Sequence, residues 1–230
     1  MNRVNKTAQQ GFTLIELMLA MAGVAFLLLA IAMTTMQISN IYSKGLLLKS
    51  VNQTGRDLSD ALQRDIKGSA PFDITSASKF VPTPHGGRLC LGQYSYVWNY
   101  GKTLELSGGP DVILYDNDIP VRMARVLDAG GQICTNAAPA QRIARANATE
   151  LLAGTDKLDL ALHTFTINSS APDAAIGQAL YSVSFTLGTN DRQSLQTGDT
   201  SCRPPNDNDS NWEFCAVNVF DFTTRAGNRT

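Results

Sequence analysis

The chain is poor in the residues and motifs that enzymes commonly use. Its 230 residues include only two histidines, His85 and His163, and neither lies beside a recognisable nucleophile or ligand motif. The sequence contains no Gly-x-Ser-x-Gly motif and no phosphate-binding loop. We therefore expect a non-enzymatic protein without a cofactor, and we expect His163, inside an apparent strand, to lie on a sheet surface.

Charge is also sparse. Asp, Glu, Lys and Arg make up 17% of the chain, and the net charge is −1, so the composition does not favour a general binder of nucleic acid or anionic lipid. Six arginines could form a patch that grips DNA phosphates, but we interpret them as scattered surface charge. They are Arg122, Arg125, Arg142, Arg145, Arg225 and Arg229.

No charged residue occurs between Glu16 and Lys44, and every residue from Leu17 to Met33 is apolar apart from Gly23. As a helix, the stretch from Phe12 to Met33 is long enough to cross most of a ~30 Å hydrocarbon core. The preceding residues carry Arg3 and Lys6 but no acid, which predicts a cytoplasmic N-terminus. Because a carboxylate inside a membrane span is costly, Glu16 needs a partner or another reason to be there.

The junction Gly11-Phe12-Thr13-Leu14-Ile15-Glu16-Leu17 resembles the signature of bacterial type IV prepilins. The resemblance implies that a prepilin peptidase cuts between Gly11 and Phe12 and methylates the new Phe12 amine. It also implies that Glu16 pairs with the Phe12 amine of a neighbouring subunit during filament assembly. A competing interpretation is that Glu16 caps its own helix, and both roles can hold.

The resemblance divides the chain into four parts. Residues 1–11 are a cytoplasmic leader that is removed, and residues 12–36 are a transmembrane helix that becomes the filament core. Residues 37–70 continue this helix in amphipathic form, and residues 71–230 form an extracytoplasmic head. An alternative is an ordinary signal peptide cut after Ala32, which would release an exported ligand-binding protein or hydrolase.

The amphipathic half carries an apolar stripe at helical spacing: Leu48, Val51, Gly55, Leu58, Leu62 and Ile66. Gly45 and Gly55 weaken the helix, and Gly68 and Pro71 end it. The segments Gln53-Thr54-Gly55-Arg56-Asp57-Leu58 and Leu62-Gln63-Arg64-Asp65-Ile66 resemble the helix end of W-type minor pilins and J-type pseudopilins. Without that resemblance, an Arg-Asp pair on a helix indicates a solvated face.

After Pro71, short apolar segments alternate with turn residues, which predicts strands. The predicted strands are residues 88–100, 112–115, 121–127, 158–167, 179–187 and 214–223, with one short helix at 139–152. The clearest strand alternates Tyr181, Val183, Phe185 and Leu187 with hydroxyl residues. The predicted fold class is α+β, a long N-terminal helix packed on a mostly antiparallel sheet.

Four cysteines, Cys90, Cys134, Cys202 and Cys215, lie beyond the apolar run, on the side where export favours disulfides. Of three connectivities we favour Cys90–Cys134 with Cys202–Cys215, because the second bridge closes a short C-terminal loop that resembles the disulfide-bounded region of many pilin heads. A four-cysteine zinc site is disfavoured because no Cys-x-x-Cys pair exists.

Asp207, Asp209 and Asn211 alternate within that loop, as calcium ligands do. However, Trp212 stands where the calcium-loop pattern requires glycine, so we interpret the segment as a polar turn.

The resemblance therefore implies a minor pilin or pseudopilin, a structural subunit of a type IV pilus (fimbrium) or a type II secretion-like filament. Its expected partners are the prepilin peptidase and methylase, an inner-membrane assembly platform and other pilins contacted through N-terminal helices. The expected location is a single-pass membrane protein with an exported head, in a cell-surface pilus or a periplasmic pseudopilus. The sequence does not separate pilus, protein-secretion and DNA-uptake roles.

Overall fold

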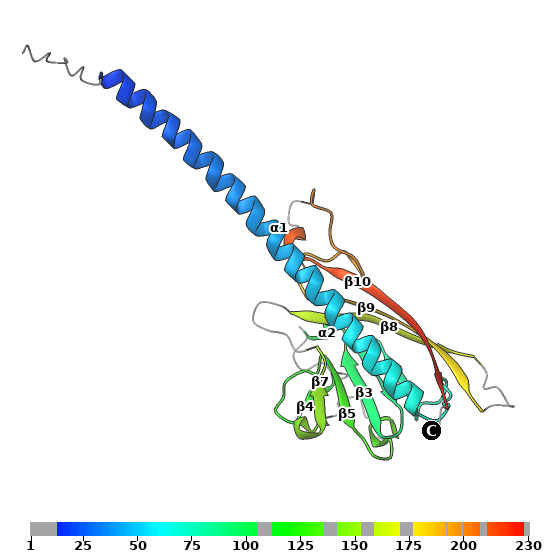
Figure 1. Cartoon of the computed structure of the whole chain (residues 1–230). Coiled ribbons are helices and arrows are strands. Elements are labelled where there is room, and N and C mark those ends of the chain that lie inside the picture. Colours follow the sequence, from blue (N-terminus) through cyan, green and yellow to red (C-terminus); the bar gives the residue numbers. More distant parts are fainter. Residues whose placement is uncertain are drawn as a thin grey trace, which may run out of the picture. The chain divides into compact units, whose positions relative to one another are not determined.

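The computed structural model describes residues 13–104, 112–135, 142–152, 159–170, 177–191, 193–198, 200–207 and 211–227. The chain divides into two compact units, residues 1–43 and residues 44–230. Helix α1 (Leu14–Gly68) is 55 residues long and contacts antiparallel sheets (Figure 1). The predicted α+β class is confirmed.

The described residues of the head form two antiparallel sheets and one small parallel pair. The larger sheet has the strand order β1-β2-β3-β5-β7, and the second has the order β10-β9-β8. The larger sheet consists of β1 (Phe80–Thr83), β2 (Gly86–Cys90), β3 (Tyr94–Asn99), β5 (Met123–Leu127) and β7 (Ala148–Glu150). The second consists of β8 (Leu160–Ser169), β9 (Ala179–Thr189) and β10 (Val217–Ala226). The parallel pair joins β4 (Leu114–Tyr115) to β6 (Arg142–Ile143).

Four short helical segments complete the described elements. They are α2 (Gly101–Leu104), α3 (Gln132–Thr135), the 3-10 turn η1 (Arg145–Asn147) and the 3-10 turn η2 (Trp212–Phe214).

The five-stranded sheet is buried on both faces, which its central strand β3 shows best. Tyr96 and Trp98 join the core that includes α1, whereas Val97 between them joins a second core on the opposite face. The second core is formed with the β4, β6 and α3 segments and includes the sulfurs of Cys90 and Cys134. Burial on both faces explains why this strand is apolar at consecutive positions instead of alternating.

The second half of α1 belongs to the unit of residues 44–230. It packs against both sheets through a stripe of buried residues at three- and four-residue spacing. Its members are Leu47, Val51, Gly55, Leu58, Leu62 and Ile66. The stripe begins one residue before the predicted one, since Leu47 is buried and Leu48 is 41% exposed. The other five positions are as predicted.

Gly55 is a point of close approach between α1 and β10. A Cβ atom built at Gly55 would overlap the ring of Phe220, which is stacked on Phe185 of β9. Gly55 is therefore required for packing as well as being a weak helix former. By contrast, a Cβ atom at Gly45 would meet nothing within 4 Å.

This difference predicts opposite effects for two matched substitutions in one helix. Gly55→Ala should lower the free energy of unfolding by about 1–2 kcal/mol, because overpacking outweighs the gain in helix propensity. Gly45→Ala should raise it by up to about 1 kcal/mol. Urea unfolding of the full chain in detergent, followed by tryptophan fluorescence, measures both. Equal stabilisation by the two substitutions would disprove the packing role of Gly55.

The predicted helix at 139–152 is wrong where the structure describes it. Residues 142–150 form β6, η1 and β7 instead, and β7 pairs antiparallel with β5 from Ala124 to Val126. Residues 148–150 therefore pair with the edge of β5 and form a strand, although the local composition of this segment favours a helix. The prediction also missed β1, which pairs with β2 across a two-residue turn.

Candidate functional site

The helix start places Glu16 beside Thr13. The Glu16 carboxylate accepts hydrogen bonds from the Thr13 backbone nitrogen at 3.0 Å and the Thr13 hydroxyl at 2.8 Å, both on Oε2. In return, the Glu16 backbone nitrogen donates to the Thr13 hydroxyl oxygen at 3.3 Å. This reciprocal arrangement is a capping box, and the Thr-x-x-Glu spacing is the signal from which it could have been predicted.

Glu16 therefore caps its own helix, as the competing interpretation proposed. A carboxylate can accept hydrogen bonds on both oxygens, so the capping box leaves Oε1 able to meet a second donor. Gly11 and Phe12, the predicted cleavage and methylation positions, lie outside the described residues. Their roles and the pairing of Glu16 with a neighbouring amine stay predictions.

The helix from Leu14 to Met33 exposes its apolar side chains on all sides. Leu14 and Phe26 are each 78% exposed, and the other large apolar residues of this stretch are also exposed: Ile15, Leu17, Met18, Leu19, Met21, Val24, Leu27, Leu28, Leu29, Ile31 and Met33. Helix α1 is long and apolar enough to cross a membrane. Since water strongly disfavours such a surface, this segment requires an apolar environment.

A second polar cluster fixes the head to α1 through Asp65. Its carboxylate accepts bonds from Arg125 Nε at 2.6 Å and from an Arg125 terminal nitrogen at 3.0 Å. The Tyr96 hydroxyl donates to the same carboxylate at 2.7 Å, and the Arg125 guanidinium lies 3.4 Å from the Tyr94 ring centroid. The Asp65 side chain is only 7% exposed, so the alternative interpretation of this Arg-Asp pair as a solvated face does not hold for Asp65.

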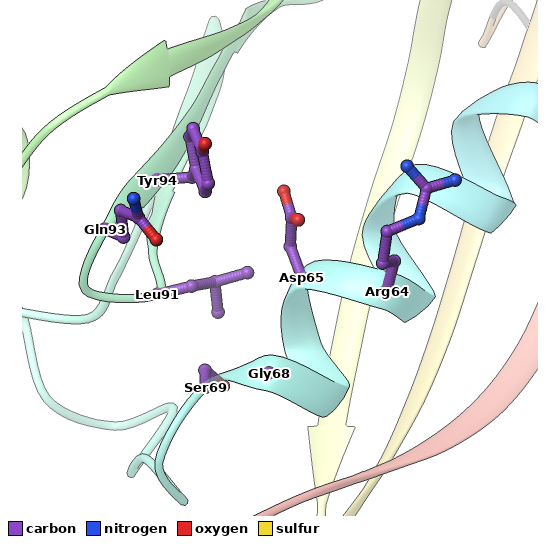
Figure 2. A pocket seen from close by; sticks show the side chains of 7 residues that line it. All are labelled: Arg64, Asp65, Gly68, Ser69, Leu91, Gln93 and Tyr94. Carbon is purple, nitrogen blue, oxygen red and sulfur yellow. The ribbon is translucent and has the colours of Figure 1, made fainter. Parts of the chain in front are cut away.

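A small pocket lies beside this cluster. Figure 2 shows Asp65 projecting from α1 on one side of the pocket. Leu91 and Gln93, from the turn between β2 and β3, and Tyr94, the first residue of β3, line the other side. The pocket volume of about 130 Å³ is well below the 300–1,000 Å³ of ordinary ligand pockets. We interpret it as a surface recess of the contact between helix and head.

Tyr96 and Tyr115 make the head sensitive to alkali. Burial, reinforced by the neighbouring Asp65 carboxylate, raises the pKa of Tyr96 above its usual value. Burial and Glu150 raise the pKa of Tyr115 in the same way. Since the unfolded chain releases these protons near pH 10 and the folded chain does not, the stability is fully present below pH ~10 and declines above it.

Above pH ~10, we predict that each of the two tyrosines lowers the free energy of unfolding by up to about 1.4 kcal/mol per pH unit. Tyr96→Phe should make this alkaline slope shallower while also lowering stability at neutral pH. Urea titrations of the full chain between pH 8 and 11 measure the slope. A slope that is unchanged in Tyr96→Phe would contradict the assignment.

The arginines considered for a basic patch are mostly engaged in separate ion pairs. Arg122 pairs with Asp159, Arg142 with Asp118, and Arg125 with Asp65. Arg145 lies 3.9 Å from Glu150 and above the Tyr115 ring, while Arg225 is exposed on β10. Arg229 lies outside the described residues. Because most of these arginines already pair with separate carboxylates, their arrangement favours the interpretation as scattered surface charge over a shared phosphate-binding patch.

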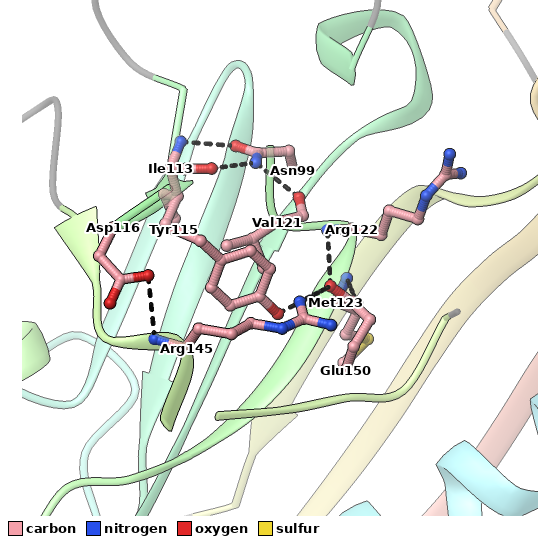
Figure 3. Close-up of polar contacts among 9 residues, drawn as sticks. All are labelled: Asn99, Ile113, Tyr115, Asp116, Val121, Arg122, Met123, Arg145 and Glu150. Carbon is pink, nitrogen blue, oxygen red and sulfur yellow. Dashed lines mark hydrogen bonds and ion pairs between the residues drawn. The ribbon is translucent and has the colours of Figure 1, made fainter. Parts of the chain in front are cut away.

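Two further polar side chains, buried Asn99 and half-buried Glu150, connect backbone segments through hydrogen bonds. The Asn99 side-chain nitrogen donates to the carbonyls of Ile113 and Val121, and its oxygen accepts from the Ile113 nitrogen (Figure 3). Glu150 accepts from the Tyr115 hydroxyl and the Met123 nitrogen, both at 2.8 Å. Because their partners are mainly backbone groups, we assign both side chains a structural role.

The two histidines differ in their surroundings. His163 is buried rather than on a sheet surface, and its Nε2 lies 3.1 Å from the Thr189 carbonyl. The cause is a register irregularity between Leu162 and Thr164, which interrupts the alternation of β8. His85 Nδ1 lies 3.5 Å from the Thr103 hydroxyl.

Both favoured disulfides are present, Cys90–Cys134 and Cys202–Cys215. The second encloses the segment considered for calcium and interpreted as a polar turn. In it, Asp207 and Asn211 are exposed, and Asp209 lies outside the described residues. Among the described residues, no group of three His, Cys, Asp or Glu side chains is placed to hold a metal ion. The interpretation of this segment as a polar turn stays a prediction, and calcium binding stays its alternative.

The chain has a long apolar N-terminal helix that packs on antiparallel sheets, and its head contains two disulfides. The architecture is pilin-like. Comparisons with protein-family models, with curated proteins and with solved structures find no match.

Proposed function

We propose that this chain is a minor pilin or pseudopilin, a non-enzymatic structural subunit of a type IV pilus or a type II secretion-like filament. One observation carries the proposal: an apolar helix with exposed side chains continues as the same helix into a folded, disulfide-bonded head. Such a helix is suited to lie first in a membrane and then among sister helices, where its apolar surface is again covered.

The sequence around the helix start supports the same proposal. A peptidase that cuts after Gly11 would leave the Phe12 amine as a positive charge close to Glu16. In a low-dielectric environment the amine of one subunit and the carboxylate of another attract strongly, and each is costly when unpaired. The pair would therefore fix the register of one helix against the next.

The proposed partners follow from this mechanism. A prepilin peptidase processes the chain, an inner-membrane platform extracts it, and other pilins receive its helix. The disulfide-bonded head is presented outside the cytoplasmic membrane, in a pilus or a periplasmic pseudopilus.

Photo-crosslinking in a bacterium that carries a type IV filament system tests the proposal. A benzoylphenylalanine at Phe26, which is 78% exposed, should form adducts with other pilins during assembly. The same probe at Ile119, an exposed residue of the head, controls for general capture. Recovery of an unattached head without helix adducts would overturn the proposal.

A further inference from the structure

The turn η2 holds two exposed aromatic side chains at the start of the head's helix. Trp212 is 37% exposed and Phe214 is 56% exposed. The Lys44 ammonium lies 3.4 Å from the Trp212 ring centroid and donates to the Trp212 carbonyl at 3.3 Å. Lys44 and Trp212 are thus in direct contact although they are far apart in the sequence.

The turn is held firmly in place. The Cys202–Cys215 disulfide ends directly after it, and both Cys215 and Ala216 are buried. The Phe214 nitrogen donates to the Asn211 carbonyl at 2.9 Å, and the same carbonyl accepts from the Ser194 hydroxyl. A fixed turn with exposed Trp and Phe side chains presents a preformed amphipathic surface.

The position of Lys44 in the sequence indicates what covers this surface. Lys44 is the first charged residue after Glu16, and the uncharged run from Leu17 to Ser43 extends about 40 Å as a helix. That length matches the ~40–45 Å thickness of a bilayer with its headgroup layers. Lys44 directly follows this run. When the run spans the bilayer with its N-terminus in the cytoplasm, Lys44 and the Trp212 ring that it contacts fall at the level of the outer headgroups.

We propose that the η2 turn docks on the outer headgroup layer of the membrane in which the subunit waits before assembly. The occupant is the zwitterionic lipid surface, into which Trp212 and Phe214 insert their rings while the Lys44 ammonium stays among the phosphates. Glu213 lies between the two aromatics in sequence and offsets the charge of Lys44. Docking therefore depends on the aromatic rings and not on anionic lipid.

This inference rests on the proposed function, because it requires an uncut apolar helix in the bilayer. It adds a second contact to that anchor. The contact restricts how the head is oriented toward the assembly machinery and must break when the helix leaves the membrane.

The two tryptophans of the chain allow a direct test. Trp98 is 0% exposed in the core, whereas Trp212 lies on the turn. The full chain is reconstituted in phosphatidylcholine vesicles with or without lipid that carries a nitroxide on its headgroup. The matched variant is Trp212→Phe, which keeps an aromatic ring and leaves Trp98 as the only emitter.

We expect the nitroxide lipid to remove most of the Trp212 emission from the unmodified chain and to leave the Trp212→Phe emission unchanged. Equal quenching of the two chains would overturn the inference. Protection of Trp212 from both nitroxide lipid and aqueous iodide would also overturn it, because the turn would then be covered by a second copy of the head. A chain that fails to float with the vesicles would contradict the proposed function instead.

Discussion

Glu16→Ala should yield a membrane-resident, processed subunit whose incorporation into filaments falls to background. The substitution removes the carboxylate that we assign to the Phe12 amine of a neighbouring subunit. It leaves the apolar surface from Leu17 to Met33 intact, so insertion into the membrane should not change. Immunoblots of membrane and sheared-filament fractions, with an antibody against the head, measure both quantities.

Thr13→Val is the matched control, because the structure shows that Glu16 also caps its own helix. This variant loses the hydroxyl that exchanges hydrogen bonds with Glu16 but keeps the charge. If Glu16 acts between subunits, Thr13→Val should still enter filaments. Equal assembly defects in Glu16→Ala and Thr13→Val would indicate that Glu16 acts only as a helix cap and would contradict its role between subunits.

Asp65→Ala should lower the free energy of unfolding of the head by about 3 kcal/mol. Removing one partner of a buried ion pair costs about 3–5 kcal/mol, and we take the low end because Arg125 is 29% exposed and can be partly solvated. The substitution also removes the acceptor of the Tyr96 hydroxyl. Urea unfolding of the full chain in detergent, followed by the emission of buried Trp98, measures the loss.

Asp60→Ala provides the comparison on the same helix. Asp60 is exposed, so this substitution should change the free energy of unfolding by less than about 0.5 kcal/mol. The double variant Asp65→Ala with Arg125→Ala should lose less than the sum of the two single variants, since they share one interaction. Equal stability of Asp65→Ala and Asp60→Ala would disprove the role of the ion pair.

The parts of the fold that follow from local patterns were predictable from the sequence. The helix stripe from Val51 to Ile66 and the strand from Tyr181 to Leu187 have regular periods, and both are present. The four cysteines allow only three pairings, of which the favoured one is present. These features depend on residues close together in sequence or on a small set of alternatives.

The features that the sequence did not predict lie where contacts between segments far apart in the sequence determine the local structure. Strand β7 forms because β5 offers an edge, and Asp65 is buried because Arg125 and Tyr96 come from a sheet placed against it. Gly55 is needed because Phe220 approaches it from the last strand. No pattern within one segment predicts such contacts, because they depend on the three-dimensional arrangement of the whole head.

The candidate site was only partly predictable for a different reason. Glu16 is conspicuous in the sequence because it is a carboxylate beside a long apolar run, and its spacing from Thr13 is that of a capping box. Trp212, by contrast, stands out in the sequence only as a residue that interrupts a calcium pattern. Its contact with Lys44 joins two segments that no local pattern connects.

Identification of the N-terminal residue of the mature protein, by mass spectrometry of the chain purified from a host with a prepilin peptidase, tests the central claim most directly. Our account predicts that the mature chain begins at an N-methylated Phe12 and retains the whole of α1. A mature chain that begins at Met33, recovered free of the membrane, would contradict it.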